Sequence, residues 1–240
     1  YRFLCWLDAI TMRNASLLIT ITEEMATEIK ERSGTLSPVQ ILSNPSVSFD
    51  EVVLPENKRL GFAFCGNAGR LQRIPLLIQA IEQYCAGGGK LPFVFAGAGV
   101  FSENLKELAD KHDNVTYFGF VSALEAAQLN ADYQWALLPI EDEVTRFAFP
   151  SKSSSYVFSD ALVAAICGTE NSVARWVLEN NLGVVLDPTA GELCRFFRTV
   201  ESGGLSPESF DTDRENLKEQ LGFEVFVERL SQLVISEQSI

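Results

Sequence analysis

The sequence predicts an α/β fold in which helices cover both faces of a parallel sheet, preceded by a small remnant of a second α/β unit. Short apolar runs typical of buried strands alternate along the chain with segments of helical character. Several of those runs end in glycine, and a polar connection at residues 43–58 separates the first two runs from the rest. We place a boundary near Pro45, so that residues 1–45 end one unit and residues 46–240 form the other.

The first unit is expected to contain a strand, a helix and a strand. Residues 17–21 read as a buried strand, and Thr22 is a typical N-cap for the helix that follows, with two glutamates in its first turn. Gly34 is expected to end that helix, and residues 39–42 form a second short strand. The chain begins at Tyr1 without a signal-peptide pattern, and we expect the natural protein to extend further toward the N-terminus.

The second unit repeats the alternation of strand and helix. We expect strands at residues 60–64, 91–96, 115–118, 135–139, 162–166 and 183–186. We expect helices at residues 74–81, 102–111, 123–128, 150–159 and 171–180, and in a tail from Gly191 that is broken by a polar loop at residues 202–213. Ligands of open parallel sheets bind at the carboxyl ends of the strands, where these glycines lie.

Composition argues against several classes of function. The net charge of −13 and the isoelectric point of about 4.6 predict repulsion from nucleic acid and from anionic membranes. The single histidine, His112, is expected to be exposed at a helix end, which argues against a Ser–His triad and most zinc sites, so no metal site is predicted. Five scattered cysteines without a C-x-x-C pair indicate reduced thiols of a cytosolic protein.

The turn after the first strand of the second unit is the segment most indicative of a ligand. Gly66, Asn67 and Gly69 lie in it, and Arg70 and Arg73 add cationic side chains. Glycine lets the backbone approach a phosphate, and unpaired N–H groups at a helix start point toward it. The turn matches neither standard nucleotide-binding pattern, so a purely structural glycine turn remains the alternative.

The order of the motifs resembles one family. A GNxGRxQ turn at residues 66–72 is followed by Gly-Ala-Gly at 97–99, by segments at 115–121 and 131–139, by Pro-Ser-Lys at 150–152, and by Gly-Val-Val-Leu-Asp-Pro at 183–188. This series resembles the C-terminal, donor-binding domain of the group 1 glycosyltransferases, which are retaining enzymes of the GT-B fold. Residues 14–25 and 41–45 resemble the end of their N-terminal domain and the interdomain hinge.

The resemblance implies a Rossmann-like fold and a nucleotide-sugar donor as substrate, with no cofactor. The diphosphate would lie against the glycine turn with Arg70 and Lys152 as cationic partners, because a departing nucleoside diphosphate carries developing negative charge. The implied donor- and phosphate-binding residues are Gly66, Asn67, Gly69, Arg70, Gln72, Ser151, Lys152 and Ser155, and the implied nucleobase region is Gly97, Phe118, Gly119 and Phe120. From the residues alone, the two phenylalanines are predicted to fill the core.

The resemblance also implies a division of labour within a longer protein. The acceptor, a glycan or a lipid-linked glycan, would bind through the N-terminal domain, of which residues 1–45 are the end. The chain alone is therefore expected to bind nucleotide without efficient transfer. A cytoplasmic location is implied, with peripheral contact to the inner face of the membrane in the full-length protein. No residue identifies the catalytic group, the sugar, the base or the acceptor.

Three departures from the family pattern leave other functions open. The two glutamates that the family carries eight positions apart are Phe147 and Ser155 here, Asp160 stands where a glycine is usual, and Gln72 and Arg73 replace a familiar lysine. The main alternative is a non-catalytic GT-B-like interaction module with a decayed donor site, which a pocket sealed by Phe147 or Phe149 would favour. A nucleotide-sugar epimerase is a third hypothesis, disfavoured because that chemistry needs placed acid and base groups. The acidic residues 141–143 are predicted to form a surface loop.

Overall fold

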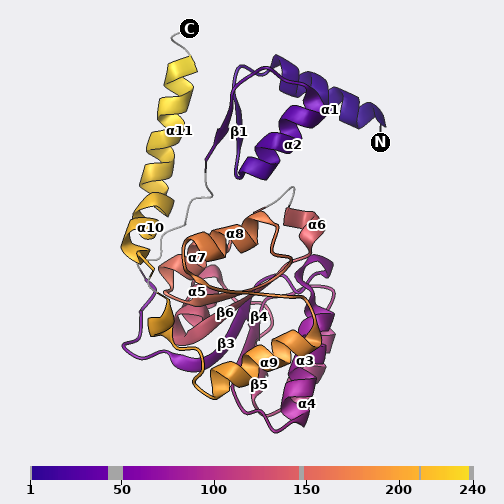
Figure 1. Cartoon of the computed structure of the whole chain (residues 1–240), viewed down its shortest axis with the longest axis vertical. Helices are drawn as coiled ribbons and strands as arrows, with labels where there is room; N and C mark the ends of the chain where they lie inside the picture. Colours follow the sequence, from indigo (N-terminus) through magenta and orange to yellow (C-terminus); the bar gives the residue numbers. More distant parts are fainter. Residues whose placement is uncertain (1, 43–50, 146–148, 211, 238–240) are drawn as a thin grey trace.

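The computed structural model describes residues 2–42, 51–145, 149–210 and 212–237 (Figure 1). It confirms the predicted fold class, a parallel sheet flanked by helices. The boundary near Pro45 and the side chain of Phe147 lie outside the described residues. None of the helices in the described ranges is both long and apolar enough to cross a bilayer.

The small unit contains α1 (Arg2–Asn14), β1 (Leu18–Thr20), α2 (Glu23–Ser33) and β2 (Val39–Ile41). The strands β1 and β2 pair in parallel, and α2 connects them. As predicted, the Thr22 side chain accepts a hydrogen bond from the N–H of Met25, and Gly34 ends α2 in the left-handed conformation with φ 65°. The helix α1 was not among the expected elements.

The large unit is a six-stranded parallel sheet in the order β5-β4-β3-β6-β7-β8. Its strands are β3 (Arg59–Cys65), β4 (Phe93–Ala96), β5 (Val115–Tyr117), β6 (Tyr133–Pro139), β7 (Leu162–Ile166) and β8 (Gly183–Leu186). The chain runs outward from β3 to β5 and then continues on the other side of β3 with β6. The strand order therefore reverses between β3 and β6, which is where open α/β sheets form a ligand crevice.

Helices cover both faces of this sheet (Figure 1). One face packs against α3 (Ile74–Ala86), α4 (Ser102–Lys111) and α9 (Ala190–Glu201). The other packs against α5 (Ala123–Asp132), α7 (Ser153–Phe158) and α8 (Ser172–Glu179). Shorter elements are η1 (Arg70–Gln72), α6 (Asp142–Thr145) and η2 (Pro207–Ser209), and the chain continues into α10 (Arg214–Leu221) and α11 (Phe223–Glu237).

Aromatic side chains make up much of the core beneath α3 and α9. Phe62 of β3 and Phe93 of β4 stack with ring centroids 4.9 Å apart, and Phe197 of α9 lies 4.8 Å from Phe62. Tyr84 of α3 lies edge-on to Phe93, and its hydroxyl accepts a hydrogen bond from the N–H of Leu91 at 3.0 Å. This packing fixes β3 and β4, whose carboxyl ends carry the glycine turns.

The histidine prediction needs a correction. His112 does end α4, but its side chain is half-buried, and its Nε2 atom is buried without a hydrogen-bond partner among the described residues. The N–H of Val115 donates to the His112 carbonyl in the turn into β5. His112 lies far from the strand ends that form the site described below, because α4 runs away from them.

Asp160 anchors α10 through a basic cluster. The ammonium of Lys218 in α10 lies 3.1 Å from the Asp160 carboxylate. Lys58 donates hydrogen bonds to the carbonyls of Ala131 and Ser159. Burial lowers the pKa of Lys58 to about 8, and the Asp160 charge opposes that shift. Asp160 has φ 52°, a conformation that glycine adopts easily and aspartate tolerates.

We expect Asp160→Asn to lower the free energy of unfolding by about 1–3 kcal/mol, because the amide keeps the backbone conformation but leaves the cationic cluster without that carboxylate. Denaturant unfolding of the purified chain measures this value. The control is Glu215→Gln, which removes a second partner of Lys218 whose side chain is 86% exposed. It should change stability by less than about 0.5 kcal/mol, and equal losses in the two variants would contradict the anchoring role.

Candidate functional site

Three glycine turns stack where β3, β4 and β5 end. The N–H of Gly66 donates to the carbonyl of Ala96 at 2.7 Å, and the N–H of Gly97 donates to the carbonyl of Gly119 at 2.6 Å. Gly97 has φ 120°, and a Cβ atom there would lie only 1.9 Å from the carbonyl oxygen of Gly66. Glycine is therefore required at residue 97 for the first two turns to approach so closely.

A cavity of about 740 Å³ opens at these strand ends. Its floor is the end of β3 and β4, and its walls come from α5, from the loop before it and from the start of α7. Small side chains on α5 (Ala123, Ala126 and Ala127) leave the space open. Seven residues predicted from the sequence line it together: Gly66, Asn67, Gly97, Phe120, Ser151, Lys152 and Ser155.

Lys152 is the charged group of this cavity. Its Nζ atom occupies the space that a side chain at residue 66 would fill, since a Cβ on Gly66 would lie 1.3 Å from it. It also lies 4.9 Å from the centre of the Phe64 ring. Among the described residues no ion-pair partner for this ammonium is found. A partly desolvated cation without a counter-ion is well placed to bind an anion.

Burial shifts the pKa values of two neighbouring groups in opposite directions. It lowers the pKa of Lys152 to about 8, with Cys65 opposing the shift. It raises the pKa of the Cys65 thiol to about 12, with Lys152 opposing. Cys65 is therefore a protonated, unreactive thiol at neutral pH, and Lys152 carries the positive charge of the pair.

The backbone amides of the turn contribute less than the sequence suggested. The N–H groups of Gly66 and Ala68 donate to the carbonyls of Ala96 and Ala98, so neither is free to bind a phosphate. The helix α3 does not follow the turn directly, because η1 lies between them. An anion in this cavity would therefore depend mainly on Lys152.

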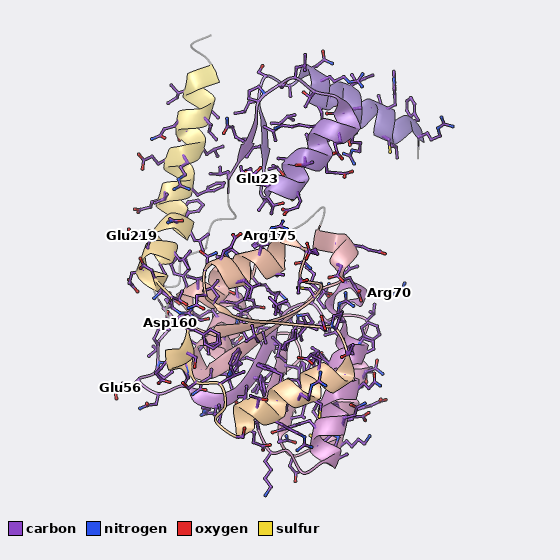
Figure 2. The ribbon with its side chains drawn as sticks, viewed as in Figure 1. Glu23, Glu56, Arg70, Asp160, Arg175 and Glu219 are labelled. Atoms are coloured by element: carbon purple, nitrogen blue, oxygen red, sulfur yellow. The ribbon has the colours of Figure 1, made fainter. Side chains whose placement is uncertain are left out.

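The remaining residues of the predicted phosphate set lie apart from this cavity. Gly69 is buried within the turn, and Gln72 lines a smaller neighbouring cavity. Arg70 is exposed on η1, and Figure 2 shows it at the periphery of the large unit. It does not line the 740 Å³ cavity.

The prediction that both phenylalanines fill the core is wrong. Phe118 is 52% exposed and Phe120 is 86% exposed. Gly119, with φ 69°, turns the chain away from β5, which is the edge strand of the sheet, so no layer covers the two rings. Phe120 lines the 740 Å³ cavity, whereas Phe118 and Gly119 lie outside its lining.

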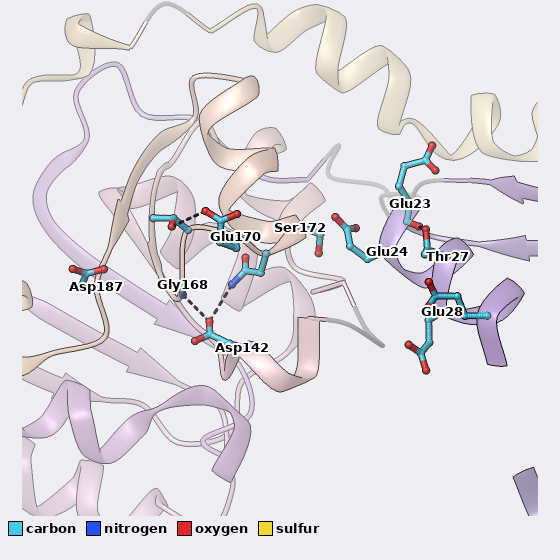
Figure 3. A pocket seen from close by; sticks show the side chains of 12 residues that line it. Glu23, Glu24, Thr27, Glu28, Asp142, Gly168, Glu170, Ser172 and Asp187 are labelled. Carbon is cyan, nitrogen blue, oxygen red and sulfur yellow. Dashed lines mark hydrogen bonds between the residues drawn. The ribbon is translucent and has the colours of Figure 1, made fainter.

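Arg73 is neutralised by the acidic segment that we predicted to be a surface loop. Its guanidinium lies 3.0 Å from Glu141 and 3.1 Å from Asp142, and Nε donates to the Ile140 carbonyl at 2.8 Å. The other oxygen of Asp142 accepts hydrogen bonds from the N–H of Gly168 and the side chain of Asn171 (Figure 3). Glu141 and Asp142 thus tie the start of α3 to the loop before α8.

Sequence reasoning missed an acidic cavity of about 950 Å³ between α2 and the loop before α8. Figure 3 shows Glu24 and Glu28 of α2 on one side and Asp142 and Glu170 on the other. Glu24, Glu28 and Glu31 are spaced by four and three residues, and this spacing could have indicated one acidic helix face. An ion pair between Glu24 and Arg175 joins α2 to α8. Across the described ranges, no three side chains of His, Cys, Asp or Glu are grouped as metal ligands.

Comparison with known proteins gave one curated relative and many solved structures. No family model matches the chain. The probable glycosyltransferase WbjE of Pseudomonas aeruginosa is 26% identical over 248 residues, an alignment that covers 94% of this chain and 60% of WbjE. The chain therefore spans about three fifths of the length of this relative.

The solved structures share the fold. HepE of Anabaena, in complex with UDP, superposes with a TM-score of 0.71 at 15% identity, over 95% of this chain and 65% of that one. Sucrose-phosphate synthase of Thermosynechococcus elongatus gives 0.70 at 13% identity, over 100% and 62%. A mutant of S. aureus TarM in a complex containing UDP gives 0.67 at 15% identity, over 92% and 45%. The chain has the Rossmann-like α/β fold of GT-B glycosyltransferases.

Proposed function

We propose that this chain is the donor-binding half of a retaining, group 1 glycosyltransferase that transfers a sugar from a nucleotide-sugar to a glycan or lipid-linked acceptor. One observation carries the proposal: the ammonium of Lys152, which has no ion-pair partner among the described residues, lies against Gly66 in a 740 Å³ cavity at the strand ends where ligands of such sheets bind. The relative's name and the UDP complexes of the fold neighbours support it.

The proposed chemistry assigns Lys152 to the departing nucleoside diphosphate. As the bond between the sugar and the diphosphate breaks, negative charge grows on the phosphate oxygen, and a fixed ammonium stabilises that charge more than it stabilises the intact donor. Lys152 is suited to this task because folding has already removed part of its hydration. Positioning the donor would supply much of the remaining rate enhancement.

The nucleoside would occupy the larger part of the same cavity. Phe120 and the alanines of α5 offer it an apolar surface, and Ser151 and Ser155 offer hydroxyl groups. Ser155 stands at the position of the family's second glutamate and lines the cavity, so we infer that a hydroxyl replaces the carboxylate there. Acceptor binding, and contact with the inner face of a membrane, would belong to the rest of the full-length protein.

Calorimetry with UDP and with GDP tests the proposal on the chain as it stands. We expect at least one of the two nucleotides to bind at a single site, with a dissociation constant in the micromolar to millimolar range of about 1 μM–1 mM that is usual for enzyme substrates. Absence of binding by both nucleotides would count against the donor site and in favour of the non-catalytic interaction module. A cavity sealed by Phe149 would have favoured that module. Phe149 instead packs edge-on to Trp176, with ring centroids 5.7 Å apart, and does not line the 740 Å³ cavity.

A further inference from the structure

One face of α5 is turned toward the 740 Å³ cavity. The residues of this helix that line the cavity are Ala123, Ala126, Ala127 and Asn130. Because residues three, four and seven positions apart lie on the same side of a helix, their four side chains share one face. This face extends about 10 Å along the helix, which is seven residues at roughly 1.5 Å each. Asn130 is the polar end of a wall that otherwise consists of alanine.

The side-chain amide of Asn130 has unused hydrogen-bonding capacity. Asn130 is 3% exposed, and its Oδ1 atom is buried without a hydrogen-bond partner among the described residues. Those residues provide no hydrogen bond to its Nδ2 atom either. Rotation about the last side-chain bond exchanges the two atoms, so either one can be the atom nearer the cavity. An unpartnered amide in a protein interior is costly, and a ligand that supplies the missing hydrogen bonds would explain it.

The other helix at this cavity also contributes polar side chains. Ser154 and Ser155 of α7 line the cavity with Asn130, and α7 packs against α5. Their hydroxyls already donate to backbone carbonyls, at 3.2 Å to Ser151 and at 2.7 Å to Lys152. Both serines can therefore accept a hydrogen bond but have no proton left to donate. Asn130 can still donate and accept.

The lining of the cavity is divided in the same way as a nucleoside diphosphate. Phe120, in the loop before α5, adds apolar surface, whereas Lys152 and the two serines of α7 are polar. In a nucleotide the flat base is the least polar part, and the ribose joins the base to the charged diphosphate. With the diphosphate at Lys152, the ribose is the part attached to it directly. Its hydroxyls therefore suit the polar side chains, and the base suits Phe120 and the alanines.

We propose that Asn130 binds the ribose hydroxyls of the nucleotide-sugar and thereby selects ribonucleotides over deoxyribonucleotides. This inference rests on the proposed function. An amide matches two neighbouring hydroxyls, because Oδ1 accepts a hydrogen bond from one while Nδ2 donates to the other. A site built to bind a hydroxyl rejects a ligand without it, since the buried group of the site is then left without a partner.

Calorimetry on the whole chain with UDP, 2′-deoxy-UDP and 3′-deoxy-UDP tests this inference, and the matching GDP series serves where GDP is the nucleotide that binds. We expect at least one deoxy nucleotide to bind about tenfold more weakly than its parent. Equal affinity of all three nucleotides overturns the inference, while their binding keeps the proposed function. Absence of binding by every nucleotide overturns both.

Asn130→Leu assigns the selection to this side chain. The variant should bind the parent nucleotide about tenfold more weakly and should no longer distinguish it from the deoxy nucleotide. Its melting temperature should stay the same or rise, because leucine replaces a buried amide that has no partner among the described residues. An asparagine with a purely structural role would give the opposite result, a lower melting temperature with the selection retained.

The control Asn216→Leu makes the same change at an exposed position on α10, outside the cavity, and should alter neither affinity nor selection. Asn130→Ala repeats the test with a smaller side chain if Asn130→Leu does not fold. Full selection against the deoxy nucleotide in a folded Asn130 variant would overturn the assignment of the ribose contact to Asn130.

Discussion

Replacing Lys152 with methionine is expected to weaken nucleoside diphosphate binding by about 1–3 kcal/mol while leaving the fold intact. The ammonium lies in the cavity without a described counter-ion, so the variant removes a charge-assisted contact to the ligand and breaks no ion pair. Burial lowers the pKa of Lys152, which means that folding works against its charge. The free energy of unfolding at neutral pH should therefore stay the same or rise in Lys152→Met.

The pH dependence of binding gives a second readout of the same group. The pKa of Lys152 in the free chain is about 8, and an adjacent diphosphate would raise it, so the complex holds more protons than the free chain above that pH. The terminal phosphate of a nucleoside diphosphate is fully ionised above about pH 7. Affinity should therefore be constant between about pH 7 and pH 8 and fall above pH 8, approaching about tenfold per pH unit. Lys152→Met should show no such fall in this range.

Arg70→Met is the matched control for these measurements. Arg70 is exposed and does not line the 740 Å³ cavity, so its replacement should change affinity by less than about 0.5 kcal/mol. The opposite ranking, with a large loss for Arg70 and a small one for Lys152, would overturn the assignment of the phosphate contact to Lys152.

Gly97→Ala is expected to lower the free energy of unfolding by about 2–5 kcal/mol. Two costs combine there: alanine is strained at φ 120°, and its Cβ would lie 1.9 Å from the carbonyl oxygen of Gly66. A backbone oxygen cannot rotate away as a side chain can, so the first two turns would have to separate. We also expect nucleotide binding to be lost, because a displaced Gly66 would no longer leave room for the Lys152 ammonium beside it.

Gly88→Ala separates the two costs. Gly88 also has a positive φ, of 84°, but a Cβ there meets nothing within 4 Å. We expect a loss of about 1–2 kcal/mol from the backbone conformation alone, with nucleotide binding unchanged. Denaturant unfolding compares the two variants, and equal losses would show that the contact between the Gly66 and Gly97 turns contributes little to stability.

The fold was largely predictable because its information is local. Each strand of the large sheet appears in the sequence as a short apolar run, and the expected strand at 183–186 matches β8, Gly183–Leu186. Thr22 and Gly34 delimit α2 by short-range hydrogen bonds that involve only their own neighbours. The helix α1 was missed because its apolar side chains, including Phe3 and Trp6, are exposed and follow no clear strand or cap pattern.

The site was predictable only in part. Gly66, Gly97 and Lys152 could be named because their residue types suit a phosphate and their motifs occur in a known order. The sequence could not predict which arginine would form ion pairs and which would stay exposed, because Arg70 and Arg73 carry the same charge and are almost adjacent. Glu141 and Asp142, far along the chain, pair with Arg73 and leave Arg70 exposed.

The sequence by itself thus determined the alternation of strands and helices and the positions of the glycine turns, because hydrophobic pattern and backbone conformation depend on near neighbours. Tertiary structure alone decided which side chains meet. It brought Lys152 into the space above Gly66, left Phe118 and Phe120 exposed at an edge strand, and formed two adjoining cavities. The first and third outcomes depend on how β3 and β6 lie next to each other in the sheet, and the second depends on β5 lying at its edge. No local pattern specifies these long-range placements.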